Sequence, residues 1–445
     1  MSLILLYCIL LAKGIGLFDV NAAVNVTGGK EKGIGRPKEW KRKWQTFLCV
    51  LLLCEIGLHG VFGIYHIGSA GRNRYVDSGQ ELKQVMSAKS DRNLYRADIV
   101  NPVLRNEELL YGLNGISMFS STNTDSMQTW MEKMGFETAT NRFQYAGSTE
   151  VTDMLLGVKY LACRKGLRMD TAYTKTYSGK FFDLYENPRA LASAYLVDAG
   201  IRNFRLDGKN PFEVQNELLK GMGYGEAFRT EEVRASDFRP QSMETVFEIP
   251  LKGGEHGYLL LNGEEPSVAN VNGRVQQAGS WNNAFLDLGY SNRARTVSVS
   301  ITKRLTKALL GTVTKSELNG VYQDLSRHIL RLENGGGEIR ADQDGVIFFP
   351  LFYDEGLHVQ VDGQQVETLN LEGMLGVPVS KGNHTVSLAY DPPGLKIGMA
   401  CSLLSVILWL ALTGQTEIYH SIRKNIFRRR LAIRETNQHN CSVSE

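Results

Sequence analysis

The chain has 445 residues, with 50 Lys and Arg against 47 Asp and Glu, which gives a formal net charge of +3. Hydrophobic residues make up 43% and charged residues 22%, which excludes a disordered tail protein, a collagen-like fibre and a protein made mostly of membrane helices. The near-zero net charge gives no argument for nucleic acid, so we expect no nucleic-acid partner. The cysteines form no CxxC pair, so neither a zinc site nor a disulfide framework is indicated.

In chain order, residues 1–66 are predicted to be a membrane segment. Residues 3–20 are a weak candidate helix because Lys13 interrupts them, and a basic cytoplasmic loop is expected at 21–45. The apolar block 46–65 is long enough to cross a hydrocarbon layer of roughly 30 Å, although a buried core helix is the alternative. It carries Glu55, an ionisable residue that is either functional or held protonated or paired at a helix interface.

A second transmembrane helix is predicted at 395–414, where residues 397–414 contain no charge. Lys and Arg gather on the outer sides of the two blocks, at 36–43 and at 423–434. Because cytoplasmic loops collect such residues, the region between the blocks is expected to be extracytoplasmic and the tail 415–445 to be cytoplasmic. An RNA-binding arm is the alternative interpretation of the basic tail.

The region between the blocks is predicted to be α+β, a membrane-anchored extracytoplasmic region with β-sandwich domains. Its expected parts are an α/β region at 67–240, a β-sandwich with a following helix at 241–335, and a small membrane-proximal β-domain at 336–394. Three helix signals stand out: 125–134, a helix capped by Asn210 with Pro211 first, and a long helix capped by Ser316 with its apolar face reaching Leu332. Hairpin turns are expected at Asp362-Gly363 and at Lys381-Gly382.

No standard catalytic pattern is present: the sequence has no HExxH, GxSxG, phosphate loop or calcium loop, and we expect no metal or cofactor. Cys163 is expected to be a small apolar residue. The run NGISMFSSTN at 114–123 is unusually rich in small polar groups that could line a sugar-binding surface beside tyrosine rings. The candidate substrate-binding residues are Tyr95, Arg96, Asn114, Ser120, Ser121 and Tyr145. The alternative is a loop of side-chain-to-backbone turns that supports the core.

These runs, together with YENPRAL at 185–191, NPFEVQNELLK at 210–220 and PPGLKIG at 392–398, resemble the YfhO family of bacterial membrane proteins. The resemblance follows the family's order over most of residues 46–414. It implies a multi-pass protein of the bacterial cell membrane that looks like a GT-C-type glycosyltransferase. It also implies sugar transfer from a polyprenyl-phosphate carrier to cell-envelope polymers such as lipoteichoic acid, with membrane lipid, the sugar carrier and the polymer as partners.

The chain departs from the family pattern in two ways. Leu357 stands where the family usually has an aromatic residue, and only the C-terminal part of the family is matched. The catalytic acids of GT-C enzymes lie in an early extracytoplasmic loop, so no catalytic residue is carried over and enzyme activity of this chain stays open. We expect the C-terminal portion of a YfhO-like protein, truncated or split. The alternative is a non-enzymatic, membrane-anchored surface-binding or scaffolding module that works with a separately encoded membrane half.

Overall fold

The computed structural model describes residues 38–66, 76–167, 169, 171–261, 267–278, 285–333 and 335–411. The predictions for residues 3–20, for the basic loop before residue 38 and for the tail 415–445 lie outside the described residues. The chain divides into two compact units, Met1–Tyr75 and Val76–Glu445.

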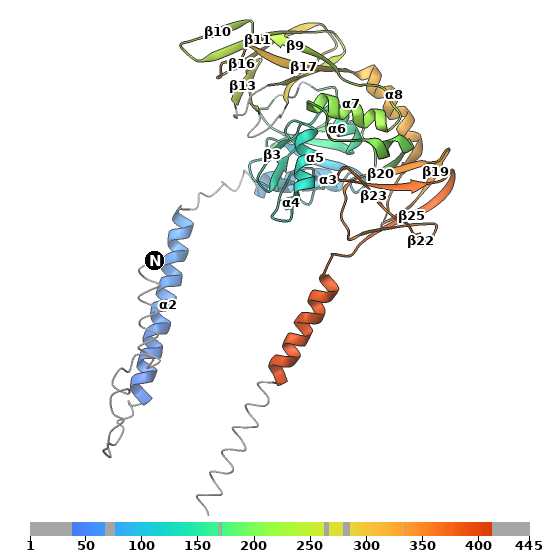
Figure 1. The fold of residues 1–445 in the computed structure, drawn as a ribbon. Helices are drawn as coiled ribbons and strands as arrows, with labels where there is room; N and C mark the ends of the chain where they lie inside the picture. The colour runs from blue at the N-terminus through green and yellow to red at the C-terminus, as the bar shows by residue number, and fades with distance from the viewer. Residues whose placement is uncertain are drawn as a thin grey trace, which may run out of the picture. The chain divides into compact units, whose positions relative to one another are not determined.

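In the described part of the first unit, the chain forms one helix, α2 (Lys38–His66; Figure 1). The apolar residues of α2 are unusually exposed, for example Leu58 at 71% and Ile64 at 81%. A helix in the second unit at 395–411 is similarly exposed. Of the helices in the described residues, none combines the length and the apolar composition needed to cross a membrane. The spans predicted at 46–65 and 395–414 are therefore not confirmed, and the second one runs past residue 411, where the description stops.

The second unit begins with α3 (Ser78–Ser87), which packs over a four-stranded sheet. The sheet order is β1-β5-β7-β6, and only the β1–β5 pair is parallel. A one-turn helix, α4 (Glu107–Leu110), and a small three-stranded sheet of order β2-β4-β3 follow β1. The strands are β1 (Arg96–Val100), β2 (Met118–Phe119), β3 (Glu137–Ala139), β4 (Arg142–Gln144), β5 (Val158–Arg164), β6 (Thr174–Ser178) and β7 (Phe182–Glu186).

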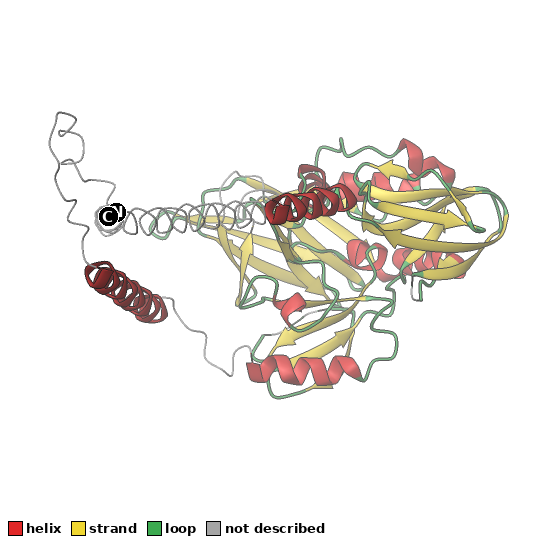
Figure 2. Cartoon of the chain, turned by 90° about the horizontal axis from the view of Figure 1, so that it is seen from below, coloured by secondary structure: helices red, strands yellow, loops and turns green. Residues whose placement is uncertain are grey.

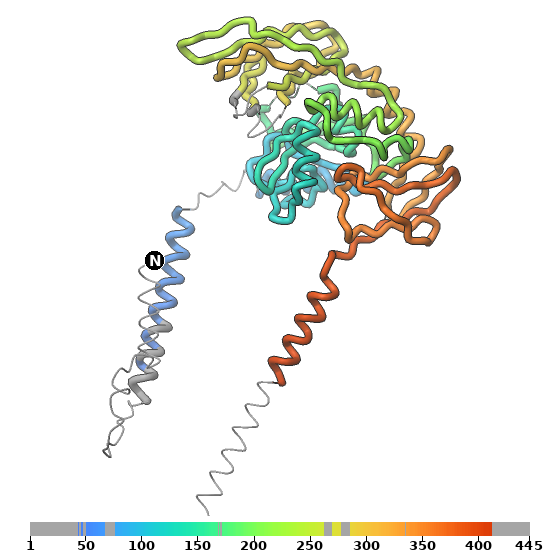
Figure 3. The backbone as a smooth tube through the Cα atoms, viewed as in Figure 1, coloured from blue at the N-terminus to red at the C-terminus, as the bar shows by residue number. Residues whose placement is uncertain are grey.

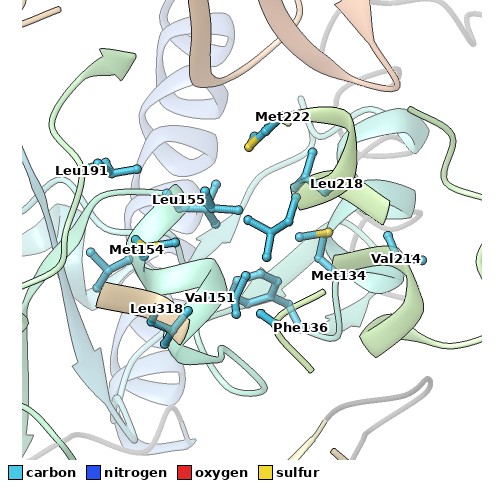
Figure 4. Close-up of a cluster of buried hydrophobic side chains, with 14 of the residues drawn as sticks. Met134, Phe136, Val151, Met154, Leu155, Leu191, Val214, Leu218, Met222 and Leu318 are labelled. Atoms are coloured by element: carbon cyan, nitrogen blue, oxygen red, sulfur yellow. The ribbon is translucent and has the colours of Figure 1, made fainter. Parts of the chain in front are cut away.

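Three helices contribute side chains to the largest core. They are α5 (Asp125–Lys133), α6 (Glu150–Leu155) and α7 (Pro211–Gly221), with a short 3-10 helix, η3 (Ala199–Asn203), before α7. Figure 4 shows their apolar side chains meeting, with Val151 and Leu155 of α6 facing Leu218 of α7. The helix predicted from Asn210 is confirmed: its side chain accepts hydrogen bonds from the amides of Phe212 and Glu213 at 3.0 and 3.1 Å.

The next segment forms a β-sandwich with a core of its own (Figure 3). One sheet has the order β10-β11-β16-β13-β14 and the other β15-β12-β17-β9. The strands are β9 (Arg229–Arg234), β10 (Asp237–Arg239), β11 (Glu244–Leu251), β12 (Glu255–Leu260), β13 (Ser267–Val271), β14 (Arg274–Ala278), β15 (Leu286–Tyr290), β16 (Arg295–Ile301) and β17 (Lys307–Thr314). Residues alternate between the core and the surface along β16, which is the pattern expected of a sandwich strand. The sandwich starts at β9, before residue 241.

The long helix that was predicted to reach Leu332 ends earlier. Helix α8 (Lys315–Leu325) is followed by a 3-10 turn, η4 (Ser326–His328), and then by strand β18 (Ile329–Leu330). Its cap is Thr314 and not Ser316, because Thr314 forms a reciprocal capping box with Glu317. Ile329 and Leu330 pair with β8 (Ala194–Val197) as a strand, so tertiary pairing overrides their helical spacing.

Two antiparallel sheets complete the described fold, and strands dominate this part of the molecule (Figure 2). Their orders are β18-β8-β20-β24-β23 and β19-β25-β21-β22. The remaining strands are β19 (Gly336–Ala341), β20 (Gly345–Phe352), β21 (Leu357–Val361), β22 (Gln364–Gln365), β23 (Leu369–Leu371), β24 (Met374–Val379) and β25 (Gly382–Tyr390). The observed architecture is thus α+β with many antiparallel sheets, as the sequence predicts.

The two predicted hairpins have different outcomes. Asp362 and Gly363 both have positive φ, at 54° and 78°, and join paired strands β21 and β22. The hairpin predicted at Lys381-Gly382 is wrong, because β24 pairs with β20 and β25 pairs with β19 and β21 in the other sheet. Strand β8 also joins β20, so the sheet of the predicted 336–394 domain includes a strand from the 67–240 region.

Candidate functional site

The six predicted binding residues lie in several different surroundings. Arg96 donates from Nε to the carbonyl of Leu156 at 2.9 Å and also donates to the carbonyl of Pro350, so its guanidinium joins the end of α6 to strand β20. Tyr95 is half-buried, with Lys159 Nζ 4.5 Å from the centre of its ring. Both side chains therefore have partners within the fold.

The serines of the 114–123 run form a surface turn. Ser120 Oγ accepts a hydrogen bond from the Thr122 amide at 3.1 Å and lies 2.7 Å from the Thr122 hydroxyl. Ser121 is exposed in the same turn. This local bonding is what the structural alternative expects of the run.

Tyr145 belongs to a buried polar network. Its hydroxyl donates to Asp153 at 2.8 Å, and the hydroxyls of Tyr173 and Ser148 donate to the same carboxyl group. Burial raises the pKa of Asp153 to about 7, although these three hydrogen bonds oppose the rise. The network holds α6 in place and presents no open side chain.

Asn114, another of the predicted residues, lines a cavity in the described structure. The cavity measures about 410 Å³ and lies between α3, the loop before β1 and the chain after α4. Its apolar wall is made by Met86, Ala97, Tyr111 and Leu113, and its polar lining consists of Lys83, Ser87, Arg92, Asn93 and Asn114. The volume falls within the range of small-molecule sites.

Two cations give this cavity its electrostatic character. Lys83 and Arg92 are exposed, and neither has a side-chain ion pair or hydrogen bond among the described residues. The lining contains no Asp, Glu, His or Cys. Two unpaired cations and two amides around an apolar wall can bind an anionic group joined to a less polar body, and phosphate suits this arrangement.

Asp91 fixes the loop that carries Arg92 and Asn93. The Asp91 carboxyl group accepts hydrogen bonds from Lys159 Nζ and from the Tyr160 hydroxyl, each at 2.5 Å. Burial opposes ionisation, but these two bonds outweigh it and hold the pKa of Asp91 below its usual value. Asp91 therefore stays ionised and keeps the cavity rim in one position.

The other wall depends on a glycine. A Cβ atom on Gly79 would lie 2.2 Å from Cε1 of Tyr111, so only glycine allows α3 to pack against this ring. The Tyr111 hydroxyl donates to Glu107 at 2.8 Å, which holds the ring in place. The cavity is thus a built feature of the packing between α3 and α4.

Another buried network lies around His256 on β12. Its two ring nitrogens meet Glu150 at 2.7 Å and Asp287 at 2.8 Å, and Arg189 donates to Glu150 at 2.7 Å. His256 is only 5% exposed. Since both nitrogens are engaged, the ring has no free position for a substrate, and the network joins α6 to the sandwich.

Cys163 is 1% exposed, and burial raises the pKa of its thiol to about 11. A thiol with this pKa is a weak nucleophile, as expected for a small apolar residue. In the residues that the structure covers, no group of three or more His, Cys, Asp or Glu side chains is placed to hold a metal ion. In α2, Glu55 Oε1 lies 3.9 Å from Nε2 of His59, which is one helical turn further along the chain.

Sequence reasoning did not find Lys83, Arg92 and Asn93. They lie at 83–93, outside the polar run, and lysine or arginine at such spacing is typical of any solvated helix face or loop. Only the fold shows that they share a cavity with Asn114.

Comparisons with known proteins add a family match. A family model described as bacterial membrane protein YfhO matches residues 1–402. The uncharacterized protein YfhO of Bacillus subtilis strain 168 is 22% identical over 384 residues, covering 74% of this chain and 44% of that protein. The chain therefore spans less than half of that relative's length.

Similarity to solved structures is weak. A β-glucuronidase from Ruminococcus gnavus has 9% identity and a TM-score of 0.17, over 37% of this chain and 40% of that chain. A conserved protein of unknown function from Pseudomonas aeruginosa has 13% identity and a TM-score of 0.12, over 37% of this chain and 93% of that chain. At these scores the similarity supports no conclusion about fold or function.

Proposed function

Because the chain belongs to the YfhO family of bacterial membrane proteins, we propose that it takes part in glycosylating cell-envelope polymers from a polyprenyl-phosphate-linked sugar. In this proposal the unit that starts at Val76 faces the outside of the cell membrane and binds the anionic polymer or the sugar-lipid. The observation that carries the proposal is the cavity with its unpaired Lys83 and Arg92. Phosphate groups occur in both proposed ligands.

The proposed membrane placement is multi-pass, with α2 and the helix at 395–411 against the bilayer. It is supported by the exposure of apolar side chains in these helices, such as Leu53 at 68% and Ile397 at 72%. Large apolar side chains exposed along a whole helix are costly in water, and lipid removes that cost. The match covers only 44% of the Bacillus relative. We therefore propose that membrane helices of a partner chain act together with this chain.

The cavity itself is proposed to bind and not to react. Acid–base help at an anomeric carbon needs a placed carboxyl group, and the described lining has none. This favours the second candidate function, a membrane-anchored binding module that positions a polymer for a separately encoded catalytic half.

The test is equilibrium binding of a poly(glycerol phosphate) chain to the full-length protein in nanodiscs. We expect Lys83→Gln with Arg92→Gln to weaken binding about a hundredfold, because two hydrogen bonds to charged groups are lost and each contributes about 1.5 kcal/mol. Lys252→Gln with Arg293→Gln is the matched control, since it removes the same charge from exposed sandwich positions. Equal weakening by both pairs would contradict a specific site.

Asn114 and Ser120 separate the two interpretations of the polar run. Asn114→Ala should weaken polymer binding without lowering the melting temperature, because the side chain lines the cavity. Ser120→Ala removes a turn contact and should affect binding less. To separate the two candidate functions, the same nanodiscs are given a polyprenyl-phosphate sugar: transfer by this chain alone supports an enzyme, and binding without transfer supports the module.

A further inference from the structure

Helix α4 has the opposite of the usual pattern of burial. Its sequence is Glu-Glu-Leu-Leu, yet Glu107 and Glu108 are 0% exposed while Leu109 and Leu110 are 58% and 52% exposed. Burying carboxyl groups costs free energy unless they are paired, and exposing leucines forgoes burial that would stabilise the fold. A surface that violates both preferences in one helical turn indicates a binding role.

The two glutamates are removed from the surface in different ways. Glu107 forms an ion pair with Arg164 and accepts hydrogen bonds from the Tyr111 hydroxyl and the Val103 amide. Glu108 has no hydrogen-bond partner for either carboxyl oxygen in the described structure, and burial beside Asp98 raises its pKa to about 8. Helix α4 therefore presents no negative charge to the outside.

The exposed leucines are part of a larger apolar patch. Asn106 bonds both backbone groups of Phe119, accepting from its amide at 2.7 Å and donating to its carbonyl at 2.8 Å. This pair of bonds fixes the α4 loop beside β2, whose two residues are both exposed. The patch, which we call the α4–β2 patch, consists of Val103, Leu109, Leu110, Met118 and Phe119.

A cation lies within this patch. The guanidinium carbon of Arg105 is 4.9 Å from the centre of the Phe119 ring, and Arg105 has no ion-pair partner among the described residues. Lys83 and Arg92 line the cavity, whose wall includes Tyr111, the residue that follows α4. Leucine, phenylalanine and methionine beside unpaired basic residues, with no accessible acid in α4, match the surface of an anionic bilayer.

Resting on the membrane placement of the proposed function, we propose that the α4–β2 patch inserts into the headgroup boundary of that membrane, with Arg105 at the phosphate level. Figure 1 shows α4 at an edge of its unit, where such a contact is open. A carbohydrate chain is a poorer fit, because sugars need polar partners and Leu109 and Leu110 offer none. The proposal does not depend on a ligand in the cavity.

The test places a nitroxide spin label at residue 119 by Phe119→Cys in the full chain, with the exposed native cysteines replaced by serine. The protein is reconstituted in vesicles of phosphatidylglycerol and phosphatidylethanolamine. Accessibility to oxygen, which concentrates in lipid, is compared with accessibility to a nickel chelate, which stays in water. A label by Val275→Cys, a 67% exposed position on the sandwich, is the matched control.

We expect oxygen to dominate at residue 119 and the nickel chelate at residue 275. Adding Leu109→Glu and Leu110→Glu should raise the accessibility of the label at 119 to the nickel chelate above its accessibility to oxygen. The accessibilities of the label at 275 should not change. Nickel accessibility at 119 in the parent protein would overturn the proposal. Protection of 119 from both reagents would also overturn it, because it would mean that protein, such as a second copy, covers the patch.

Discussion

Glu108 is fully buried, and its carboxyl group lies beside that of Asp98. It lies against Gly115, where a Cβ atom would be 2.8 Å from the Glu108 Cγ atom and 3.1 Å from Asp98 Oδ2. The carboxyl oxygens of Asp98 accept hydrogen bonds from the amides of Ile99, Ile116 and Ser117. Glu108 is therefore more stable as the neutral acid.

This predicts a pH dependence of stability. The pKa of Glu108 is raised from 4.5 to about 8 in the fold, so the folded state holds a proton that the unfolded state has lost. Stability from this group is complete below pH 4.5 and is lost as the pH rises towards 8. We expect Glu108→Gln to match the parent protein near pH 4.5 and to melt at a higher temperature at pH 8, as measured by differential scanning fluorimetry. A constant difference across this range would contradict the assignment.

His256 is the second residue whose charge matters for the fold. Burial alone would lower its pKa, but Asp287 and Glu150 outweigh that effect and raise it from 6.5 to about 10. Its contribution is complete below pH 6.5 and disappears as the pH passes 10. Breaking a buried pair typically costs about 3–5 kcal/mol because one charge is left unpaired.

We therefore expect His256→Gln to lower the free energy of unfolding by about 3 kcal/mol at pH 7, and the loss to shrink towards pH 10. Urea denaturation, monitored by fluorescence, measures this free energy of unfolding. His358→Ala, an exposed histidine on β21, is the control and should change little. A His256 variant as stable as the parent at pH 7 would show that Arg189 alone satisfies Glu150.

At the scale of elements, the cap of α7 makes a sharp test of local sequence signals. Asn210 Oδ1 accepts two amides, and Pro211 occupies the first helical position. We expect Asn210→Ala to cost about 1 kcal/mol of stability, and Asn210→Ser to cost less because serine also caps. Thermal unfolding measures both, and equal losses would mean that the Asn210 contact with Glu213 matters more than the cap.

The elements that sequence predicts well are those whose signals are local. Asn210-Pro211 begins α7, and Asp362-Gly363 turns β21 into β22, because each depends on bonds within a few residues. Lys381-Gly382 also has a glycine at the second position, but its flanking strands pair with distant partners. Ile329 has helical spacing but pairs with Tyr195, about 130 residues away in sequence. Long-range pairing of this kind leaves no mark in a single sequence.

The candidate site follows the same division. Asn114 was found because it lies in a polar run, whereas Lys83 and Arg92 reach the cavity only through the packing of α3 on β1. Arg96 and Tyr145 have side chains suited to binding sugar, yet the fold uses them on the carbonyl of Leu156 and the carboxyl group of Asp153. Residue type predicts which bonds a side chain can make, and packing decides its partners.

At the scale of the whole molecule, the second unit contains a sheet built from segments that are far apart in the sequence. Strand β8 lies between β18 and β20, so residues 194–197 complete a sheet whose other strands come from residues 329–379. The sandwich at 229–314 is inserted between these two segments and has a core between its own sheets, although Tyr258, Phe285 and Val313 pack into the largest core. The inserted part is thus closer to independence than the part that surrounds it.

This organisation predicts different behaviour of two fragments. Residues 226–316 contain both sandwich sheets in full, and we expect the fragment to fold, giving dispersed amide signals in a proton–nitrogen NMR spectrum. Residues 326–394 lack β8, so the edge of β20 with buried Val346, Ile347 and Phe348 is left unpaired, and we expect aggregation or disorder. Adding residues 188–204 as a separate peptide should restore order to the second fragment, because the peptide supplies β8. If residues 326–394 fold alone, the pairing of β8 with β20 is not needed for this sheet.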